Sequence, residues 1–360
     1  MGFVWGSFAV LLADLSRSLD LSAGHLGLAL SGGMVASFPV MTLAGRAADR
    51  TGRRPLLVAS AASMGVGFAW LAFVGSLASL FMALLLLSAA SGAYDVAANA
   101  AAMDYEQATG LKRMALIHVA FSAGGALGAL FAGFLISASV DFRIVYLTAL
   151  VPLGTGVFGA VKTRFPPVEG SRKGTRAGLY GDAPLLLVAL VAALAFLSEA
   201  AMEHWSGVYL RNTLALPALV GASGVAAYHA SMATGRLASA AAISRFGNHR
   251  TLRAAGLLAA GGMALALTTR GPVLVVCGFL VVGLALSAVV PIALSLAGDM
   301  FPERSGEASS VVTTLGYGGF LVGPILVGTA ATLLSLRLAL GVVVLAGITI
   351  STLAGTCGKR

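Results

Sequence analysis

Four polar side chains stand in two pairs inside otherwise apolar stretches of the sequence. Asp95 and Asn99 form the first pair, and Glu199 and Glu203 form the second. Residues four apart share one face of a helix, so each pair presents its polar groups together. Two carboxylates that close in a poor dielectric resist joint ionisation, so one of them can hold a proton near neutral pH. The pairs suit proton transfer or solute binding, and the alternative for Asp95 and Asn99 is a structural interhelical hydrogen bond.

Two histidines and a tryptophan are further candidates, and each has a structural alternative. His118 and His229 can respond to protons, but a buried histidine is more often a satisfied donor. His118 also has acidic residues nearby in the sequence, Asp104 and Glu106, with which it could pair. Trp205 follows the second pair, and near a membrane surface it would serve as an aromatic anchor instead.

The composition places these side chains in a membrane protein. The 360 residues are 58% hydrophobic and 10% charged, whereas soluble domains are about 25% charged. The net charge of +9 does not indicate nucleic-acid binding, because the basic residues fall between apolar runs. Cys277 and Cys357 give no disulfide framework and no metal-site spacing. Since no catalytic triad or nucleotide loop is present either, we expect no metal, no cofactor and no enzymatic activity.

Apolar runs long enough to cross a bilayer predict twelve helices. A crossing takes about 20 helical residues, and backbone in lipid must satisfy its own hydrogen bonds. The first run is short, so we expect either an N-terminally truncated first helix or a partly inserted one. The twelve runs cover 2–16, 25–45, 55–74, 78–101, 114–138, 143–161, 183–209, 217–240, 251–269, 272–295, 306–334 and 336–356.

A segment rich in proline, glycine and basic residues divides these helices into two groups of six. It predicts a linker over 162–182 between an N-terminal bundle at 1–161 and a C-terminal bundle at 183–360. Basic residues concentrate on the cytoplasmic side of membrane proteins. With the linker placed inside, all but five of the 23 Lys and Arg residues fall inside as well. The linker and the C-terminus are therefore predicted to be cytoplasmic. The five outer residues are Arg17, Arg143, Arg211, Arg270 and Arg337.

The stretch GRAADRTGRRP, residues 45–55, concentrates charge between the second and third helices. Its glycines permit close helix approach and a tight loop, and its carboxylate can cap a helix or pair with arginine. Residues 235–250, after the eighth helix, also begin with Gly-Arg but lack the acidic residue. The stretch resembles motif A of the major facilitator superfamily. The residues at motif positions are Gly45, Asp49, Arg50, Gly52, Arg53 and Arg54.

This resemblance implies an all-α fold of twelve transmembrane helices in two pseudo-symmetric halves that work by alternating access. It also implies that the motif A residues latch the cytoplasmic face shut in the outward-open state; the alternative is that the arginines only fix the topology. The stretches 92–106, 118–129, 199–211 and 316–324 are similar to the fucose-permease-like branch, and more narrowly to its uncharacterised bacterial inner-membrane members.

Together these features predict a monomeric secondary transporter in the lipid bilayer of the bacterial inner membrane. We expect it to move a small polar solute, a sugar or related metabolite, by proton symport. One alternative is a proton-antiport exporter of drugs or metabolites. Helix 5 argues against it, because the drug-antiporter signature there usually includes a Gly-Pro pair and helix 5 of this chain has no proline. A membrane sensor that binds the solute without moving it is a further alternative.

Overall fold

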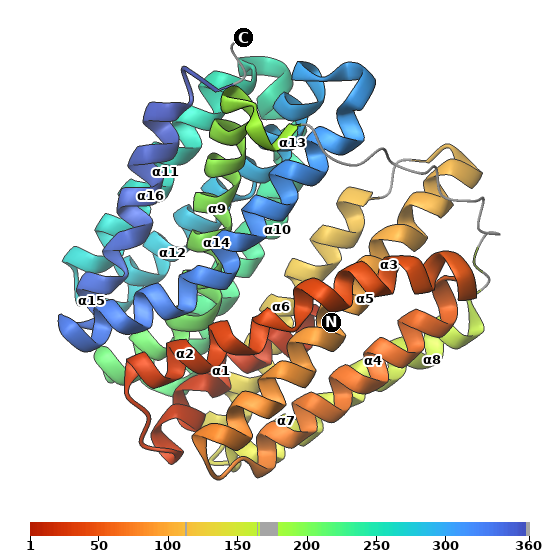
Figure 1. Cartoon of the computed structure of the whole chain (residues 1–360). Coiled ribbons are helices and arrows are strands. Elements are labelled where there is room, and N and C mark those ends of the chain that lie inside the picture. Colours follow the sequence, from red (N-terminus) through yellow and green to blue (C-terminus); the bar gives the residue numbers. More distant parts are fainter. Residues whose placement is uncertain (112–113, 164, 166–178, 358–360) are drawn as a thin grey trace.

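In the computed structural model, the described residues are 1–111, 114–163, 165 and 179–357, and helices make up most of them (Figure 1). The helices of the first half are α1 (Gly2–Ser18), α2 (Ala23–Val35), α3 (Ser37–Thr51), α4 (Arg53–Trp70), α5 (Leu77–Thr109), α6 (Met114–Ser137), α7 (Phe142–Thr148) and α8 (Leu150–Lys162). Those of the second half are α9 (Ala183–Val208), α10 (Ala218–Phe246), α11 (Asn248–Thr268), α12 (Pro272–Leu286), α13 (Val289–Met300), α14 (Ser305–Leu333), α15 (Leu336–Ala339) and α16 (Gly341–Leu353).

These helices confirm the predicted all-α membrane fold. Within the described ranges, four predicted spans are each built from two helices, namely α2 with α3, α7 with α8, α12 with α13 and α15 with α16. By length and hydropathy, 10 described segments can cross a membrane, and α1 and α10 are the two that fall outside these limits. The boundaries of the linker stay a prediction, because most of 162–182 lies outside the described part of the chain.

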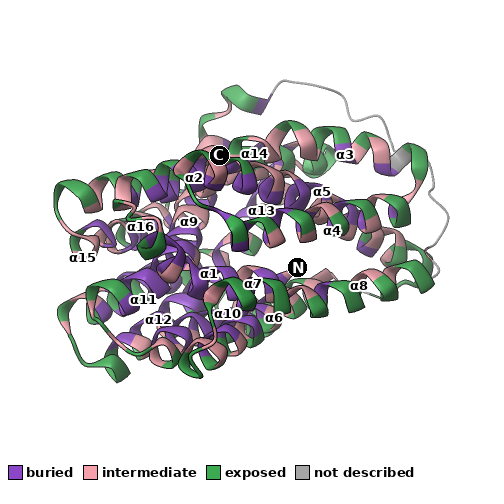
Figure 2. Ribbon diagram, turned by 90° about the horizontal axis from the view of Figure 1, so that it is seen from below, coloured by how far each residue is buried: buried purple, intermediate pink, exposed green. Residues whose placement is uncertain are grey.

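The two halves pack together mainly along three pairs of helices. These pairs are α6 with α10, α2 with α14, and α1 with α9. Most residues of α1 and α9 are buried, and Figure 2 shows both helices in the centre of the molecule. We call the end where α8 stops and α9 starts the linker end, and the opposite end the far end. The halves meet toward the far end and diverge toward the linker end (Figure 1).

Hydrogen bonds join α2 to α14 at the far end. Gly24 N donates to Thr332 Oγ1 at 2.9 Å, and Ile325 N donates to Ser31 Oγ, also at 2.9 Å. Pro324 lies inside α14 just before the second bond, where its ring disturbs the regular backbone ladder of the helix. The backbone N–H of Ile325 is thereby satisfied by the other half of the molecule.

A buried ion pair joins α1 to the end of α9. Arg211 lies in a short π-helix, η3 (Tyr209–Thr213), and its Nη1 donates to Asp14 Oδ2. The two side chains are 7% and 14% exposed. Arg17 Nη2 donates to Asp14 Oδ1 at 2.5 Å from the adjacent turn of α1. The far end is therefore closed by charge as well as by packing.

Two tight turns occupy equivalent places in the two halves. Gly52 ends α3 with φ 88°, and Gly247 ends α10 with φ 77°, a region of backbone conformation that favours glycine. The sequence comparison aligned Gly235 with Gly45. The two turns instead make Gly247 the counterpart of Gly52, because Gly235 lies well inside α10 and does not correspond to Gly45. Ser244 stands three residues before Gly247, as Asp49 stands before Gly52.

The ion pair predicts a charge-swap experiment. Replacing Asp14 by Asn leaves the Arg211 charge buried without its partner, which costs about 3 kcal/mol. We expect Asp14→Asn and Arg211→Gln each to lower the thermal unfolding midpoint of the purified protein. The double variant Asp14→Arg with Arg211→Asp should recover part of the loss. Equal midpoints for the wild type and both single variants would contradict this role.

A second readout of the same variants follows the opening of the far end. Ser31 is buried between α2 and α14, so a cysteine at this position reacts with a maleimide only when the halves separate. In a background in which Cys277 and Cys357 are replaced by alanine, Asp14→Asn should speed the labelling of Ser31→Cys. An unchanged labelling rate would show that the ion pair does not hold the halves together.

Close packing of α9 against α14 predicts a contrast between two adjacent glycines. A Cβ on Gly319 would lie 1.9 Å from the backbone oxygen of Ala193, whereas one on Gly318 would meet nothing within 4 Å. Overpacking of this kind costs about 1–3 kcal/mol. We expect Gly319→Ala to lower the thermal midpoint and Gly318→Ala to leave it unchanged or to raise it. If the thermal midpoint of Gly319→Ala equals that of the control variant Gly318→Ala, α9 and α14 can move apart at no cost in stability.

Candidate functional site

The first polar pair lies where the two halves face each other. Tyr317 of α14 donates its hydroxyl to Asp95 Oδ2 at 3.3 Å. Asp95 is 18 residues from the start of α5, or about 27 Å along the helix, close to its middle. Asn99 Nδ2 donates to the backbone oxygen of Asp95 at 2.9 Å, so the two residues are one turn apart as predicted. The pair is thus linked to the opposite half by a side chain that sequence reasoning did not select.

The second polar pair lies on α9 in the interior of the protein. Glu199 is buried, and it interacts electrostatically with Glu203, as the four-residue spacing predicts. Glu199 also interacts electrostatically with Tyr317, the partner of Asp95. No hydrogen bond from a residue in the described ranges reaches either glutamate carboxylate. Acidic groups of both halves therefore converge on one region, and two of them have acceptor oxygens available.

His118 and Arg236 lie in the same region, and the Arg236 guanidinium brings a positive charge to it. His118 interacts electrostatically with Asp95 and with Arg236. Its suggested pairing with Asp104 or Glu106 is wrong, since Asp104 pairs with Arg53 and Glu106 accepts from Met114 N at 2.7 Å.

Arg236 lies within the predicted helix at 217–240, and the structure extends this helix to Phe246, ten residues beyond Arg236. Arg236 Nη1 donates to His118 O at 3.0 Å and to Ser122 Oγ at 2.6 Å. Hydropathy gave no signal for this extension, because the end of α10 carries few large apolar residues.

Trp205 is buried, and its proposed role as an aromatic anchor at the membrane surface is wrong. Its side chain is 0% exposed, and its Nε1 has no hydrogen-bond partner among the residues that the structure describes. It packs beside Gly328 of α14, where an added Cβ would lie 3.2 Å from the indole. His229 is likewise buried, and its Nε2 has no partner in the described part of the chain.

Aromatic rings from both halves surround His204, next to the glutamates. Trp5 and Phe8 of α1 contact its ring edge-to-face at centroid distances of 6.5 and 6.3 Å. Phe320 of α14 contacts it at a centroid distance of 6.0 Å. His204 Nδ1 lies 2.8 Å from the backbone oxygen of Ala200. These rings give the polar region an apolar wall, a combination typical of small-molecule sites.

The motif A residues lie at the linker end, where α3 meets α4. Arg53 forms a two-pronged pair with Asp104 of α5, with Nε–Oδ2 2.7 Å and Nη2–Oδ1 3.2 Å. Arg54 donates to the backbone oxygen of Thr163. Arg50 is exposed, and the side chain of Asp49 lies outside the described residues.

The packing partners of the motif A helix belong to its own half. α3, which contains Gly45, packs against α5, α4 and α2. Gly52 lies between α3 and α4 with nothing within 4 Å of an added Cβ, so its turn is open to its surroundings. The contacts described for Arg53 and Arg54 therefore fit a linker end that is open, and the latch stays a prediction.

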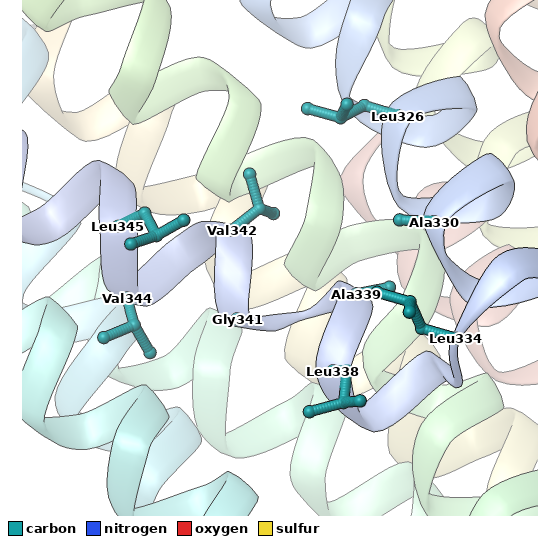
Figure 3. A pocket seen from close by; sticks show the side chains of 9 residues that line it. All are labelled: Leu326, Ala330, Leu334, Leu338, Ala339, Gly341, Val342, Val344 and Leu345. Atoms are coloured by element: carbon teal, nitrogen blue, oxygen red, sulfur yellow. The ribbon is translucent and has the colours of Figure 1, made fainter.

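A separate hollow of about 500 Å³ lies between α14, α15 and α16. Its lining is entirely apolar, as Figure 3 shows for Leu326, Leu334, Leu338 and Leu345. Such a surface offers nothing to orient a polar solute. In the described ranges, no group of His, Cys, Asp and Glu could hold a metal ion.

Comparison of the sequence with known families gives a match over nearly the whole chain. The pattern of the Major Facilitator Superfamily matches residues 1–324 and, in part a second time, 225–356. An uncharacterized MFS-type transporter of Yersinia pestis is 28% identical over 98% of this chain and 92% of its own. An uncharacterized transporter of Sinorhizobium fredii is 30% identical over 92% of this chain and 88% of its own. The membrane protein MosC of Rhizobium meliloti is 25% identical over 97% of this chain and 86% of its own.

Solved structures share the fold at low sequence identity. A mutant of the nucleoside transporter NupG superposes with a TM-score of 0.83 at 14% identity, over 99% of this chain and 96% of that one. A second structure is a bacterial homologue of the human lysosomal transporter Spinster in an inward-facing and occupied conformation. It superposes with a TM-score of 0.80 at 14% identity, over 99% of this chain and 94% of that one. The chain therefore belongs to the Major Facilitator Superfamily and is a membrane transporter of that family.

Proposed function

We propose that this transporter carries a small polar solute, a sugar or a related metabolite, by proton symport across the bacterial inner membrane. The observation that carries the proposal is the Asp95–Tyr317 hydrogen bond between the two halves, with Glu199 and Glu203 nearby. Ionisable side chains at such depth are costly and mark substrate or proton pathways. Asp95 and Glu199 are the proposed proton carriers, and Asn99, Glu203, His118 and Trp205 are proposed to line the site.

The contacts between the two halves, closed at one end and divergent at the other, support alternating access. The linker (162–182) and the C-terminus are proposed to be cytoplasmic, which makes the far end periplasmic. Closure of the far end by Asp14 and Arg211, with divergence at the linker end, then corresponds to an inward-open state. The motif A residues are proposed to latch the linker end in the opposite state, in which α3 would approach the second half. A monomer suffices for this cycle, because the site lies between two halves of one chain.

The choice of solute has two further supports. NupG is named a nucleoside transporter, and a nucleoside contains a sugar with several hydroxyl groups. The resemblance to the fucose-permease-like branch points to sugars as well. Aromatic rings beside hydrogen-bonding carboxylates, as found around His204, Glu199 and Tyr317, suit the apolar faces and the hydroxyl groups of such solutes.

An uptake screen tests this function. Cells expressing the full chain are supplied with a panel of labelled sugars and nucleosides, with and without a protonophore. We expect uptake of at least one solute to be abolished by the protonophore, and Asp95→Asn to reduce it about tenfold or more, equivalent to a loss of about 1.4 kcal/mol.

The matched control is Asp141→Asn. Asp141 is an exposed carboxylate at the N-cap of α7, and asparagine caps helices as well as aspartate does. Uptake by this variant should equal that of the wild type. If proton-driven uptake is the same in Asp95→Asn as in the wild type, the assignment of Asp95 is wrong. If protonophore leaves the uptake intact, symport is wrong.

Removal of the Tyr317 hydroxyl provides a milder perturbation of the same pair. Tyr317→Phe keeps the stacking on Phe196, where the rings lie 5.0 Å apart and 19° from parallel, but deletes the hydrogen bond to Asp95. A hydrogen bond to a charged group contributes about 1.5–3 kcal/mol. We expect uptake to fall and its pH profile to move, since one stabiliser of the Asp95 carboxylate is lost. A fall in uptake with an unmoved pH profile would argue against Asp95 as the proton carrier.

A further inference from the structure

Arg236 is a cation at mid-helix that the proposed function does not use. It lies 18 residues from the start of α10 and 10 from its end, or about 27 and 15 Å along the helix. An arginine at this depth of a transmembrane bundle is costly unless it has a partner or a ligand. Its position between the halves places it beside the proposed solute site.

The described contacts of Arg236 use one of its three nitrogens. Nη1 donates to His118 O and Ser122 Oγ of α6. Within the described part of the chain, Nε and Nη2 have no hydrogen-bond partner, and no carboxylate lies within the 4.0 Å of an ion pair. A guanidinium carries five N–H groups arranged to receive a carboxylate in two-pronged fashion. Arg236 thus retains donors of the geometry that an anionic group requires.

Acidic side chains lie near Arg236 without forming an ion pair with it. Glu199 and Glu203 both interact with it electrostatically. The other titratable groups that face this region are Asp95, His118, Tyr228, His229 and Tyr317. Two of them, Tyr228 and His229, carry buried polar atoms without a hydrogen-bond partner among the described residues. The region therefore holds a free guanidinium edge, unsatisfied polar groups and two uncontacted carboxylates.

We infer that Arg236 binds the anionic group of the transported solute, and that this solute is a carboxylated polar molecule of the sugar-acid type. This inference rests on the proposed function and narrows its substrate class. An anion on Arg236 is repelled by Glu199 and Glu203 while both are ionised. Binding therefore favours protonation of at least one of them, so the carboxylate and a proton cross together without net charge.

Binding to the purified full chain tests the inference. Gluconate and glucuronate are compared with the neutral sorbitol and glucose by calorimetry, at constant ionic strength, at about pH 6 and about pH 8. We expect an acid to bind and its neutral counterpart to bind about tenfold more weakly or not at all. The affinity for the acid should be higher at the lower pH, because the glutamates are then more often protonated.

Three variants separate a binding role from a structural one. Arg236→Gln should reduce the affinity for the acid about tenfold or more, and Arg236→Lys should retain part of it because the charge remains. Ser122→Ala removes one hydrogen bond between the halves but keeps the guanidinium, so it should bind the acid nearly as the wild type does. Equal losses in Ser122→Ala and Arg236→Gln would overturn the inference, since Arg236 would then act only as a brace between α6 and α10.

The remaining outcomes distinguish this inference from the proposed function. The inference is overturned if neither acid binds. It is also overturned if a neutral sugar binds to the wild type and to Arg236→Gln with equal strength. If that neutral sugar is nevertheless taken up in a proton-driven, Asp95-dependent manner, the proposed function stands. A thermal midpoint of Arg236→Lys near that of the wild type confirms that the variant is folded in these measurements.

Discussion

Charged side chains cannot face lipid without a large cost, and this constraint decides where the functional groups of this chain lie. α5, α9 and α10 carry Asp95, Glu199 and Arg236 on the sides that face the interior between the halves. The surface between the two halves is a place where such groups from several helices can meet away from lipid. Asp95, Glu199 and Arg236 meet there for this reason, although they are far apart in the sequence.

The same surface has to separate at one end while it stays closed at the other. At the far end, small residues of α2 and α14 let the helices approach closely, and the Asp14–Arg211 pair adds charge attraction. Away from the far end the halves are also joined by polar contacts, such as the hydrogen bonds from Tyr317 to Asp95 and from Arg236 to Ser122. Polar contacts of this kind can exchange partners with a solute, whereas the packed helices within each half move as units.

Local features of the sequence predicted the helices and the polar pairs well. Apolar runs identify helices in lipid because no other structure satisfies the backbone, and a spacing of four residues places Asn99 one turn from Asp95. The motif A turn at Gly52 follows from glycine chemistry in the same way.

Features that depend on which helix faces meet could not be predicted. Tyr317 lies 222 residues from Asp95 in the chain, and no local pattern marks the two as partners. The burial of Trp205 depends on α14 lying against α9. The predicted helix ended at residue 240 because the polar end of α10 resembles a loop in hydropathy, although its backbone is helical to Phe246.

Distances between spin labels test most directly whether the halves rock about this polar region. Labels at Thr51 and Phe246 report the linker end, and labels at Phe73 and Leu333 report the far end. Acidification from about pH 8 to about pH 6 neutralises carboxylates that repel one another between the halves. The account predicts a second population in which the linker-end distance is shorter and the far-end distance is longer. Two distances that stay constant, or that lengthen together, would contradict it.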